Sequence, residues 1–153
     1  MNGPVPRATV EAFYRAYKSR NPEQIGTMLD DDVEWHVTGP SEAITICGFW
    51  RGKAAVIERF RMMSQVLTVN RVDIEHLLID GDSSAMFGRI TSLLHANKRV
   101  ISHRVSHIVR YSGGKVVYFR VINDTFDAAE QFLGHRLNVH DTSAPADGEL
   151  VAL

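Results

Sequence analysis

The chain has 153 residues, with 17 Lys and Arg against 18 Asp and Glu, and 44% of its residues are hydrophobic. This is the composition of one ordinary soluble domain. The net charge of −1 argues against binding to nucleic acid or an anionic membrane, because both need clustered Lys and Arg. No apolar run approaches the roughly 20 residues that span a bilayer, and the N-terminus lacks the apolar core of a signal peptide. The single cysteine, Cys47, agrees with a reducing compartment. We therefore expect a cytoplasmic protein that binds neither nucleic acid nor membrane.

Helices are predicted in the first part of the chain. Apolar residues fall at helical spacing within residues 7–18, on one stripe: Val10, Phe13, Tyr14 and Tyr17. Asn21 followed by Pro22 is typical of a helix start, because the Asn side chain caps free amides and proline fits the first helical position. This second, short helix is expected to end at the aspartates 30–32. A third helix is predicted from Gly52 to about Leu67, with its stripe at Ala55, Val56, Arg59, Phe60, Met63 and Val66.

Strands dominate the rest of the chain. In residues 33–37 apolar and polar residues alternate, which predicts a half-buried strand with Trp35 inward and His36 outward, followed by a loop through Gly39, Pro40 and Gly48. Further strands are expected over 72–78, 84–95, 101–111 and 116–124. Gly88 favours a bulge or bend, because glycine weakens strand pairing. A last helix is expected from Asp127 to Leu133, ending at Gly134.

This order of elements predicts an α+β fold. The N-terminal helices would pack on one face of a strongly curved, mostly antiparallel sheet. Long strands twist and coil, so the sheet should form an open cone with a pocket at its mouth. We expect one domain over residues 1–134 and a polar, loose tail over 135–153.

Three stretches carry a family resemblance: VEWHVTGP, GFWRGKAAVIERF and RYSGGKVVYFRVINDTFDAAEQFLG. The residues in these stretches and the order of the stretches resemble the SnoaL-like, polyketide-cyclase-like branch of the NTF2-like superfamily, over roughly residues 7–134. The resemblance implies the cone fold and a homodimer formed through the outer sheet face. The superfamily includes ketosteroid isomerases, epoxide hydrolases, polyketide cyclases, dehydratases and non-catalytic relatives, so the fold alone selects no activity.

The resemblance can be tested at single positions. Ketosteroid isomerases need a tyrosine in the first helix and a carboxylate at the end of the first strand, where this chain has Phe13 and Val37. That activity is therefore not expected. The polyketide-cyclase pattern has an aspartate at the end of the last strand, just before the C-terminal helix, and Asp124 stands at that position.

The register of the last hairpin decides which side chains meet. Gly113 and Gly114 favour a two-residue turn, since both positions need positive φ. Counting outward from that turn places His107 opposite Arg120 and His103 opposite Asp124. A three-residue loop would instead turn Val117, Phe119, Val121 and Asn123 onto the histidine face and Asp124 outward.

In the two-residue register, His103 and Asp124 would be the catalytic pair. An apolar wall raises the pKa of a carboxyl group, so Asp124 would act as general base and His103 would orient it or deliver a proton. Asp124 could instead be a helix N-cap, and each histidine a satisfied, half-buried polar group.

The remaining candidates are substrate-binding residues. His107 and Arg120 would hold an anionic or enolic oxygen, and the pocket wall would include Trp35, Tyr17, Tyr118, Phe49 and Trp50. His103 and His107 lie four residues apart on a strand, about 13 Å, which is too far to share one metal ion. We therefore predict neither a metal site nor another cofactor.

Together these residues predict a small-molecule enzyme that performs general acid/base chemistry on a carbonyl compound, of the cyclase, isomerase or dehydratase type. Its ligand would be hydrophobic with a polar carbonyl or hydroxyl group. The alternatives are a non-catalytic, small-ligand-binding homodimer and an interaction module whose outer sheet presents Arg104, Ile108 and Arg110 to a partner.

Overall fold

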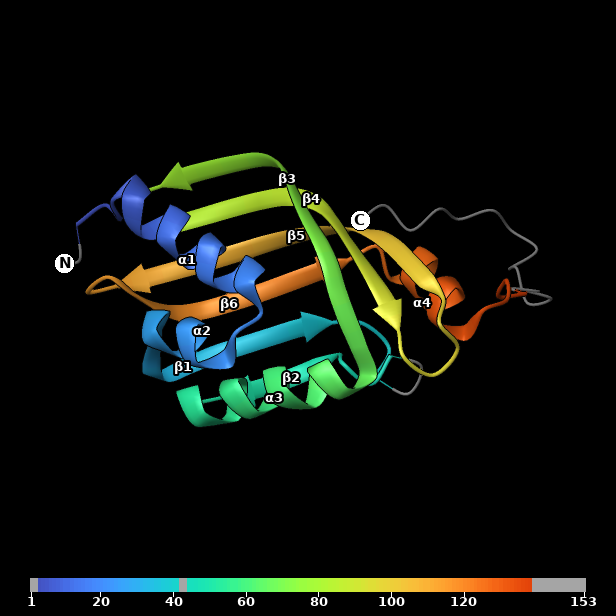
Figure 1. The fold of residues 1–153 in the computed structure, drawn as a ribbon. Coiled ribbons are helices and arrows are strands. Elements are labelled where there is room, and N and C mark those ends of the chain that lie inside the picture. The colour runs from blue at the N-terminus through green and yellow to red at the C-terminus, as the bar shows by residue number, and fades with distance from the viewer. Residues whose placement is uncertain (1–2, 42–43, 139–153) are drawn as a thin grey trace, which may run out of the picture.

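A computed structural model describes residues 3–41 and 44–138. Three helices, α1 (Arg7–Ser19), α2 (Pro22–Met28) and α3 (Lys53–Val66), lie on one face of the sheet, and α4 (Thr125–Leu133) lies at one end (Figure 1). The strands are β1 (Leu29–Thr38), β2 (Gly48–Arg51), β3 (Leu67–Asp80), β4 (Ser83–Leu94), β5 (Val100–Ser112) and β6 (Lys115–Asn123). This arrangement confirms the predicted α+β cone.

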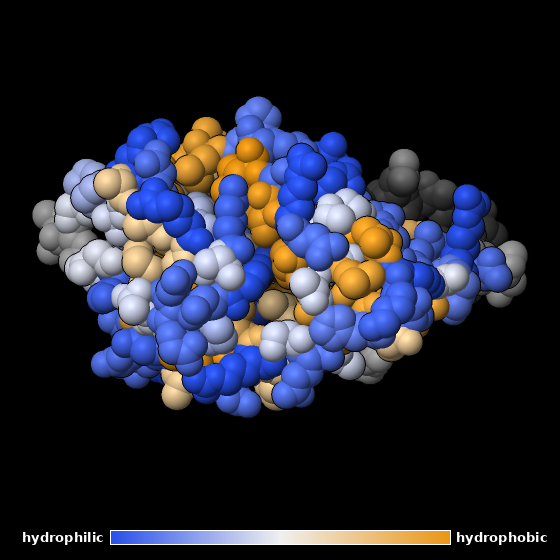
Figure 2. Space-filling view, viewed as in Figure 1, coloured by the Kyte–Doolittle hydropathy of each residue, from blue (hydrophilic) through white to orange (hydrophobic). Residues whose placement is uncertain are grey.

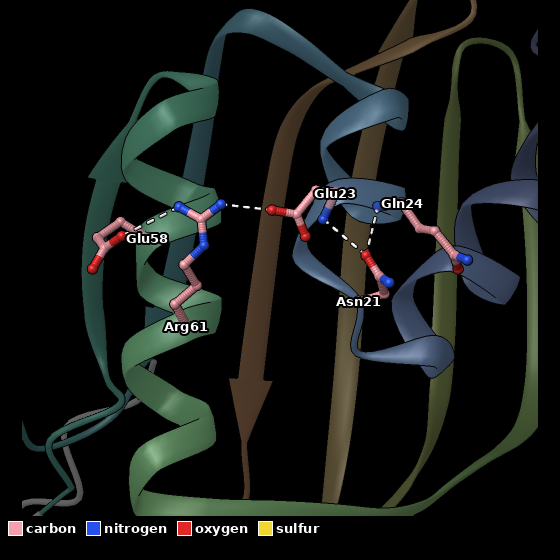
Figure 3. Close-up of polar contacts among 5 residues, drawn as sticks. All are labelled: Asn21, Glu23, Gln24, Glu58 and Arg61. Carbon is pink, nitrogen blue, oxygen red and sulfur yellow. Dashed lines mark hydrogen bonds and ion pairs between the residues drawn. The ribbon is translucent and has the colours of Figure 1, made fainter.

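All four predicted helices are present. The predicted stripe of α1 is buried against the sheet. The side chain of Asn21 accepts hydrogen bonds from the amides of Glu23 and Gln24 at 3.0 and 3.1 Å, which caps the N-terminus of α2 (Figure 3). Arg20 ends α1 with a left-handed φ of 56°, which turns the chain into α2. Apolar residues fill the surface between α1 and β3 on this side of the molecule (Figure 2).

The sheet has the order β2-β1-β6-β5-β4-β3 and is antiparallel except between β1 and β6. Two expectations about its edge are wrong. Residues 30–32 do not end α2, because they belong to β1, and residues 48–51 are not loop, because they pair with β1 as β2. β2 has only four residues with little alternation of burial, so its sequence carries no strand pattern.

β3 bends sharply as it crosses from α3 to the far edge of the sheet (Figure 1). Its register with β4 shifts twice, once on either side of Val72, and the second shift follows Ile74, which pairs with Gly88. A Cβ atom at Gly88 would collide with the carbonyl oxygen of Asp73, so only glycine fits this close approach. The predicted bulge or bend at Gly88 is confirmed, and it helps to curve the sheet around the space beneath the helices.

The β5–β6 hairpin combines the predicted turn with an unpredicted bulge. Gly113 and Gly114 form the two-residue turn with φ of 55° and 77°. A register shift at Val117 then moves every later pair by one residue, so that His107 lies opposite Val121 and Ile108 opposite Arg120. The predicted His107–Arg120 and His103–Asp124 pairs are therefore wrong.

The bulge has a physical cause in the side chains that it redirects. It buries Phe119 and Val121 on the inner face and leaves Arg120 on the outer face. A shift of one residue exchanges the two faces of a strand, and the register that buries apolar side chains is the more stable.

The end of the described chain continues past α4. Leu137 packs against the core, and its amide donates to the side chain of Glu130 at 2.8 Å. Most of the predicted loose tail, residues 139–153, lies outside the described residues. Within the described ranges, no helix is long and apolar enough to cross a membrane.

Candidate functional site

A cavity of about 40 Å³ lies between the helices and the inner face of the sheet. Apolar side chains form most of its wall: Val37, Ile46, Met63, Leu67, Val69, Ile90, Ile101, Val121 and Phe132. Its polar residues are Tyr17, Arg20, Arg59, Ser92, His103 and Asn123. An apolar wall with a few convergent polar groups is typical of small-molecule sites.

Two further hollows share parts of this wall. One, of about 280 Å³, shares Ile46, Arg59 and Met63 with the cavity, and another, of about 120 Å³, shares Arg20, Met63, Leu67 and Val69. Met63 therefore lies between all three spaces. Its unbranched side chain is adaptable, so a small movement would join the cavity to either hollow.

His103 is the predicted catalytic residue that the structure places on the cavity wall. Its side chain is buried, and Nδ1 has no hydrogen-bond partner among the described residues. Burial lowers the pKa of His103 below 6.5. The side chain of Asn123, through a hydrogen bond, and the negative charges of Asp127 and Asp124 offset part of this decrease. The imidazole is therefore mainly neutral at pH 7 and can accept a proton.

Asp124 is not on that wall. It is exposed at the N-cap of α4, where its carboxylate accepts a hydrogen bond from the amide of Asp127 at 3.4 Å. Its own amide donates to the carbonyl oxygen of Arg104 at 3.0 Å. The expectation that Asp124 faces His103 across the hairpin is therefore wrong, and the observed geometry is that of the alternative, a helix cap.

His107 lies deeper than the cavity. Its ring is stacked on Tyr14 with a centroid separation of 5.9 Å and contacts Tyr17 and Phe119 edge-on. Neither ring nitrogen has a hydrogen-bond partner among the described side chains and backbone. Burial, followed by the charge of Arg20, lowers the pKa of His107 to about 3. His107 is therefore a neutral core residue, and it does not line the cavity.

The other predicted binding residues divide between the two faces of the sheet. Tyr17 lines the cavity, and Trp50 lines the adjoining hollow. Trp35 is fully buried and stacks on Phe119 at 3.7 Å, so it supports the wall from behind. Three residues lie on the outer face, away from the cavity: Arg120, Tyr118 and Phe49.

Two arginines complete the cavity. Arg59 is only 6% exposed; its Nη2 donates to the carbonyl oxygen of Ile46 at 3.2 Å, and its Nε has no partner among the described residues. The Nε and Nη2 atoms of Arg20 are also buried and have no hydrogen-bond partner among the described residues. Neither guanidinium forms an ion pair with a carboxylate of the described chain.

Aromatic faces surround these two cations. The Arg20 guanidinium lies 4.2 Å from the centroid of Tyr17 and 5.9 Å from that of Phe60. The Arg59 guanidinium lies 5.2 Å from the Phe60 centroid and 4.9 Å from that of Trp50. Burial is the main reason that the pKa of Arg59 falls to about 10, so the Arg59 side chain remains charged at pH 7.

Comparison with known proteins identifies the family. A family model described as the SnoaL-like domain matches residues 10–119. The chain belongs to the SnoaL-like family. The predicted SnoaL-like resemblance is thereby confirmed, and the fold is that of solved NTF2-like proteins. The search of functionally curated proteins found no match.

Solved structures agree on the fold of this SnoaL-like chain. It is similar to a provisionally assigned isomerase from Rhodopseudomonas palustris, with 29% identity, a TM-score of 0.77 and coverage of 86% of this chain and 100% of that one. TerC crystallised with polyporic acid has 21% identity, a TM-score of 0.72 and coverage of 82% and 96%. An LEH-like epoxide hydrolase from M. tuberculosis has 18% identity, a TM-score of 0.67 and coverage of 83% and 88%. At the identities of these last two, the likeness establishes the fold alone.

Sequence reasoning missed the two arginines of the SnoaL-like cavity. The signal for Arg59 was present, because this charged residue falls on the apolar stripe of α3 between Val56 and Phe60. Arg20 had no comparable signal, since its direction depends on the left-handed end of α1. Phe13 and Val37, which replace the ketosteroid-isomerase tyrosine and carboxylate, are both buried and apolar.

Proposed function

We propose that this SnoaL-like chain is an enzyme that transfers protons on a small carbonyl compound bound in the cavity, with His103 as the general base. The observation that carries the proposal is the buried Nδ1 of His103, which has no hydrogen-bond partner among the described residues and belongs to a residue of the mostly apolar cavity wall. A neutral imidazole is available at pH 7 because burial lowers the pKa of His103. Asp124 supports the fold as a cap and is not assigned the base role.

The chemistry follows from this placement. His103 takes a proton from the carbon next to a carbonyl group, so that the C–H bond breaks, an N–H bond forms and the electron pair moves onto the carbonyl oxygen. Isomerase, cyclase and dehydratase reactions of carbonyl compounds can share this step.

The size and lining of the site support a small, mostly apolar ligand. A water molecule needs about 10–15 Å³ of such space, so the cavity of about 40 Å³ holds only a small group unless Met63 moves. The hollow of about 280 Å³ beside Arg59 could then take the rest of the ligand. TerC, a structural neighbour, was crystallised with polyporic acid, which is consistent with a ligand of this kind in the same fold.

Hydrogen–deuterium exchange tests the proposal directly. Cyclohexanone in D₂O should lose its α-protons faster with the protein present, as followed by proton NMR. His103→Gln should slow this exchange about 10²- to 10⁴-fold, whereas His76→Gln, which changes an exposed histidine, should not. The exchange rate should decrease only once the pH is below 6.5, because burial lowers the pKa of His103. Equal rates in His103→Gln and the wild type would remove His103 as the base.

A homodimer is the second part of the proposal. Phe87, Ile108 and Ile122 are 40%, 44% and 45% exposed, and they lie close together on the outer face, because Ser106 pairs with both Phe87 and Ile122. Exposed apolar groups that lie together favour an interface. Ile108→Asp should halve the mass measured by analytical ultracentrifugation. A wild-type chain that sediments as a monomer would contradict this part without affecting the cavity chemistry.

A further inference from the structure

Two arginines on the same helix have opposite surroundings. Arg61 is exposed and pairs with Glu23 at 2.6 Å and Glu58 at 3.5 Å (Figure 3). Arg59, two residues earlier on α3, points into the cavity and has no carboxylate partner in the described ranges. Arg20 joins it from the end of α1, also without an acidic partner there. The cavity therefore contains two positive charges that no described acid neutralises.

This arrangement is costly for the protein alone. A buried charge without a counter-ion loses its hydration, and a second charge of the same sign nearby adds repulsion. Both guanidinium carbons lie within 6 Å of the Phe60 ring centroid, and the charge of Arg20 is one of the causes that lower the pKa of Arg59. Aromatic faces offset part of this cost. They leave the Nε–H groups of both arginines, and one terminal nitrogen of Arg20, without acceptors among the described residues.

We propose that Arg20 and Arg59 bind a carboxylate group of the substrate, so that the substrate is a carbonyl compound that also carries a carboxylate. The planar guanidinium fork matches the two oxygens of a carboxylate. This inference rests on the proposed function for the carbonyl group, while the carboxylate subsite rests on the two arginines alone.

The position of the subsite agrees with a substrate that reaches His103. Arg20 and Arg59 line the same cavity as His103, and Arg59 also borders the larger hollow. A carboxylate between the two guanidiniums would therefore lie at the junction of the two spaces. The rest of the molecule could then extend along the apolar wall toward the imidazole.

Equilibrium binding separates this inference from catalysis. The probes are benzoate and benzamide, which have the same size and shape but differ in charge, with binding measured by calorimetry at pH 7.5. Benzoate should bind about 10- to 150-fold more tightly than benzamide, as expected for hydrogen bonds to a charged group. Arg59→Met and Arg20→Met should each remove most of that preference. Arg59→Lys, which keeps the charge without the fork, should retain part of it.

The matched control is Arg61→Met, which removes the same charge from the exposed side of α3 and should leave benzoate binding unchanged. Arg59→Met should also keep or raise the melting temperature of the free protein, because it removes a buried, uncompensated charge. A purely structural arginine would instead lower that temperature. Loss of folding in Arg59→Met, equal binding of benzoate and benzamide, or tighter binding of inorganic phosphate than benzoate would overturn the inference.

The two proposals fail in different ways. His103→Gln should leave benzoate binding intact, since the imidazole takes no part in holding the carboxylate. Charge-independent binding together with His103-dependent exchange of cyclohexanone would overturn the carboxylate subsite and keep the enzyme. Charge-dependent binding of benzoate without exchange of any carbonyl compound would keep the subsite and overturn the proposed function.

Discussion

The inner face of β5 carries two histidines, His107 and His103, in very different surroundings. At His107 the cone is closed by aromatic rings from α1 and β6, and the imidazole is held as part of the core. At His103 the same face opens onto a cavity whose wall includes two guanidiniums that form no ion pair within residues 3–41 and 44–138. The packed region stabilises the curved sheet, and the open region leaves polar groups free to meet a ligand.

This difference separates residues that stabilise the fold around the site from residues that would contact a ligand. At the closed end the rings fill the space between α1 and the sheet, and His107 does not line the cavity. Both ends contain buried polar atoms without hydrogen-bond partners among the described residues, but those of His103, Arg20 and Arg59 belong to residues that line a cavity. Substitutions at the two ends should therefore fail in different ways: closed-end variants lose stability, and cavity variants lose binding or rate.

The largest expected effect is at the closed end. Trp35 is fully buried and stacks on Phe119, so Trp35→Ala should lower the free energy of unfolding by about 3–5 kcal/mol. Urea denaturation of the two proteins measures this change. Leu78→Ala, which truncates an apolar side chain that is 69% exposed, should change stability by less than about 0.5 kcal/mol. Similar losses in both variants would mean that the closed end is not the stabilising region.

A second prediction concerns acid stability. The pKa of His107 is about 3 in the folded chain against 6.5 when it is exposed, so below pH 6.5 the unfolded chain binds a proton that the folded chain does not. Stability should fall by about 1.4 kcal/mol per pH unit from this group as the pH drops toward 3. His107→Met, similar in size and apolar, should therefore reduce the loss of stability between pH 8 and pH 5 by about 2 kcal/mol.

Urea denaturation at both pH values measures that difference. His76→Gln is the control, because His76 is exposed and its replacement should leave the pH dependence unchanged. An unaltered pH dependence in His107→Met would show that His107 is not held neutral by the core.

The fold was predictable because its determinants are local or repetitive. The stripe of α1, the cap at Asn21 and the turn at Gly113 and Gly114 each depend on a few neighbouring residues, and all three are confirmed. β2 was missed because it is a strand only through its pairing with β1. Such an edge strand has little pattern of its own, so its existence depends on contacts distant in sequence.

The site was harder to predict, because a bulge of one residue decides which side chains of β6 face the cavity. The bulge at Val117 keeps the predicted turn and still reverses the face of every residue from Tyr118 onward. Alternation alone fits both registers, and the choice depends on burying Phe119 in place of Arg120 against helices that pack from elsewhere in the chain. His103 could be identified because β5 alternates clearly, whereas its expected partner, Asp124, could not be placed.

The smallest expected effects are at Asp124, just beyond the cavity end. Asp124→Ala removes the N-cap of α4 and should cost about 1 kcal/mol, whereas Asp124→Asn keeps an acceptor for the amide of Asp127 and should cost only a few tenths. Neither variant should slow the exchange of cyclohexanone, since the carboxylate does not line the cavity. A folded Asp124→Asn protein that loses the exchange would return the base role to Asp124, because asparagine preserves the cap but cannot accept a proton.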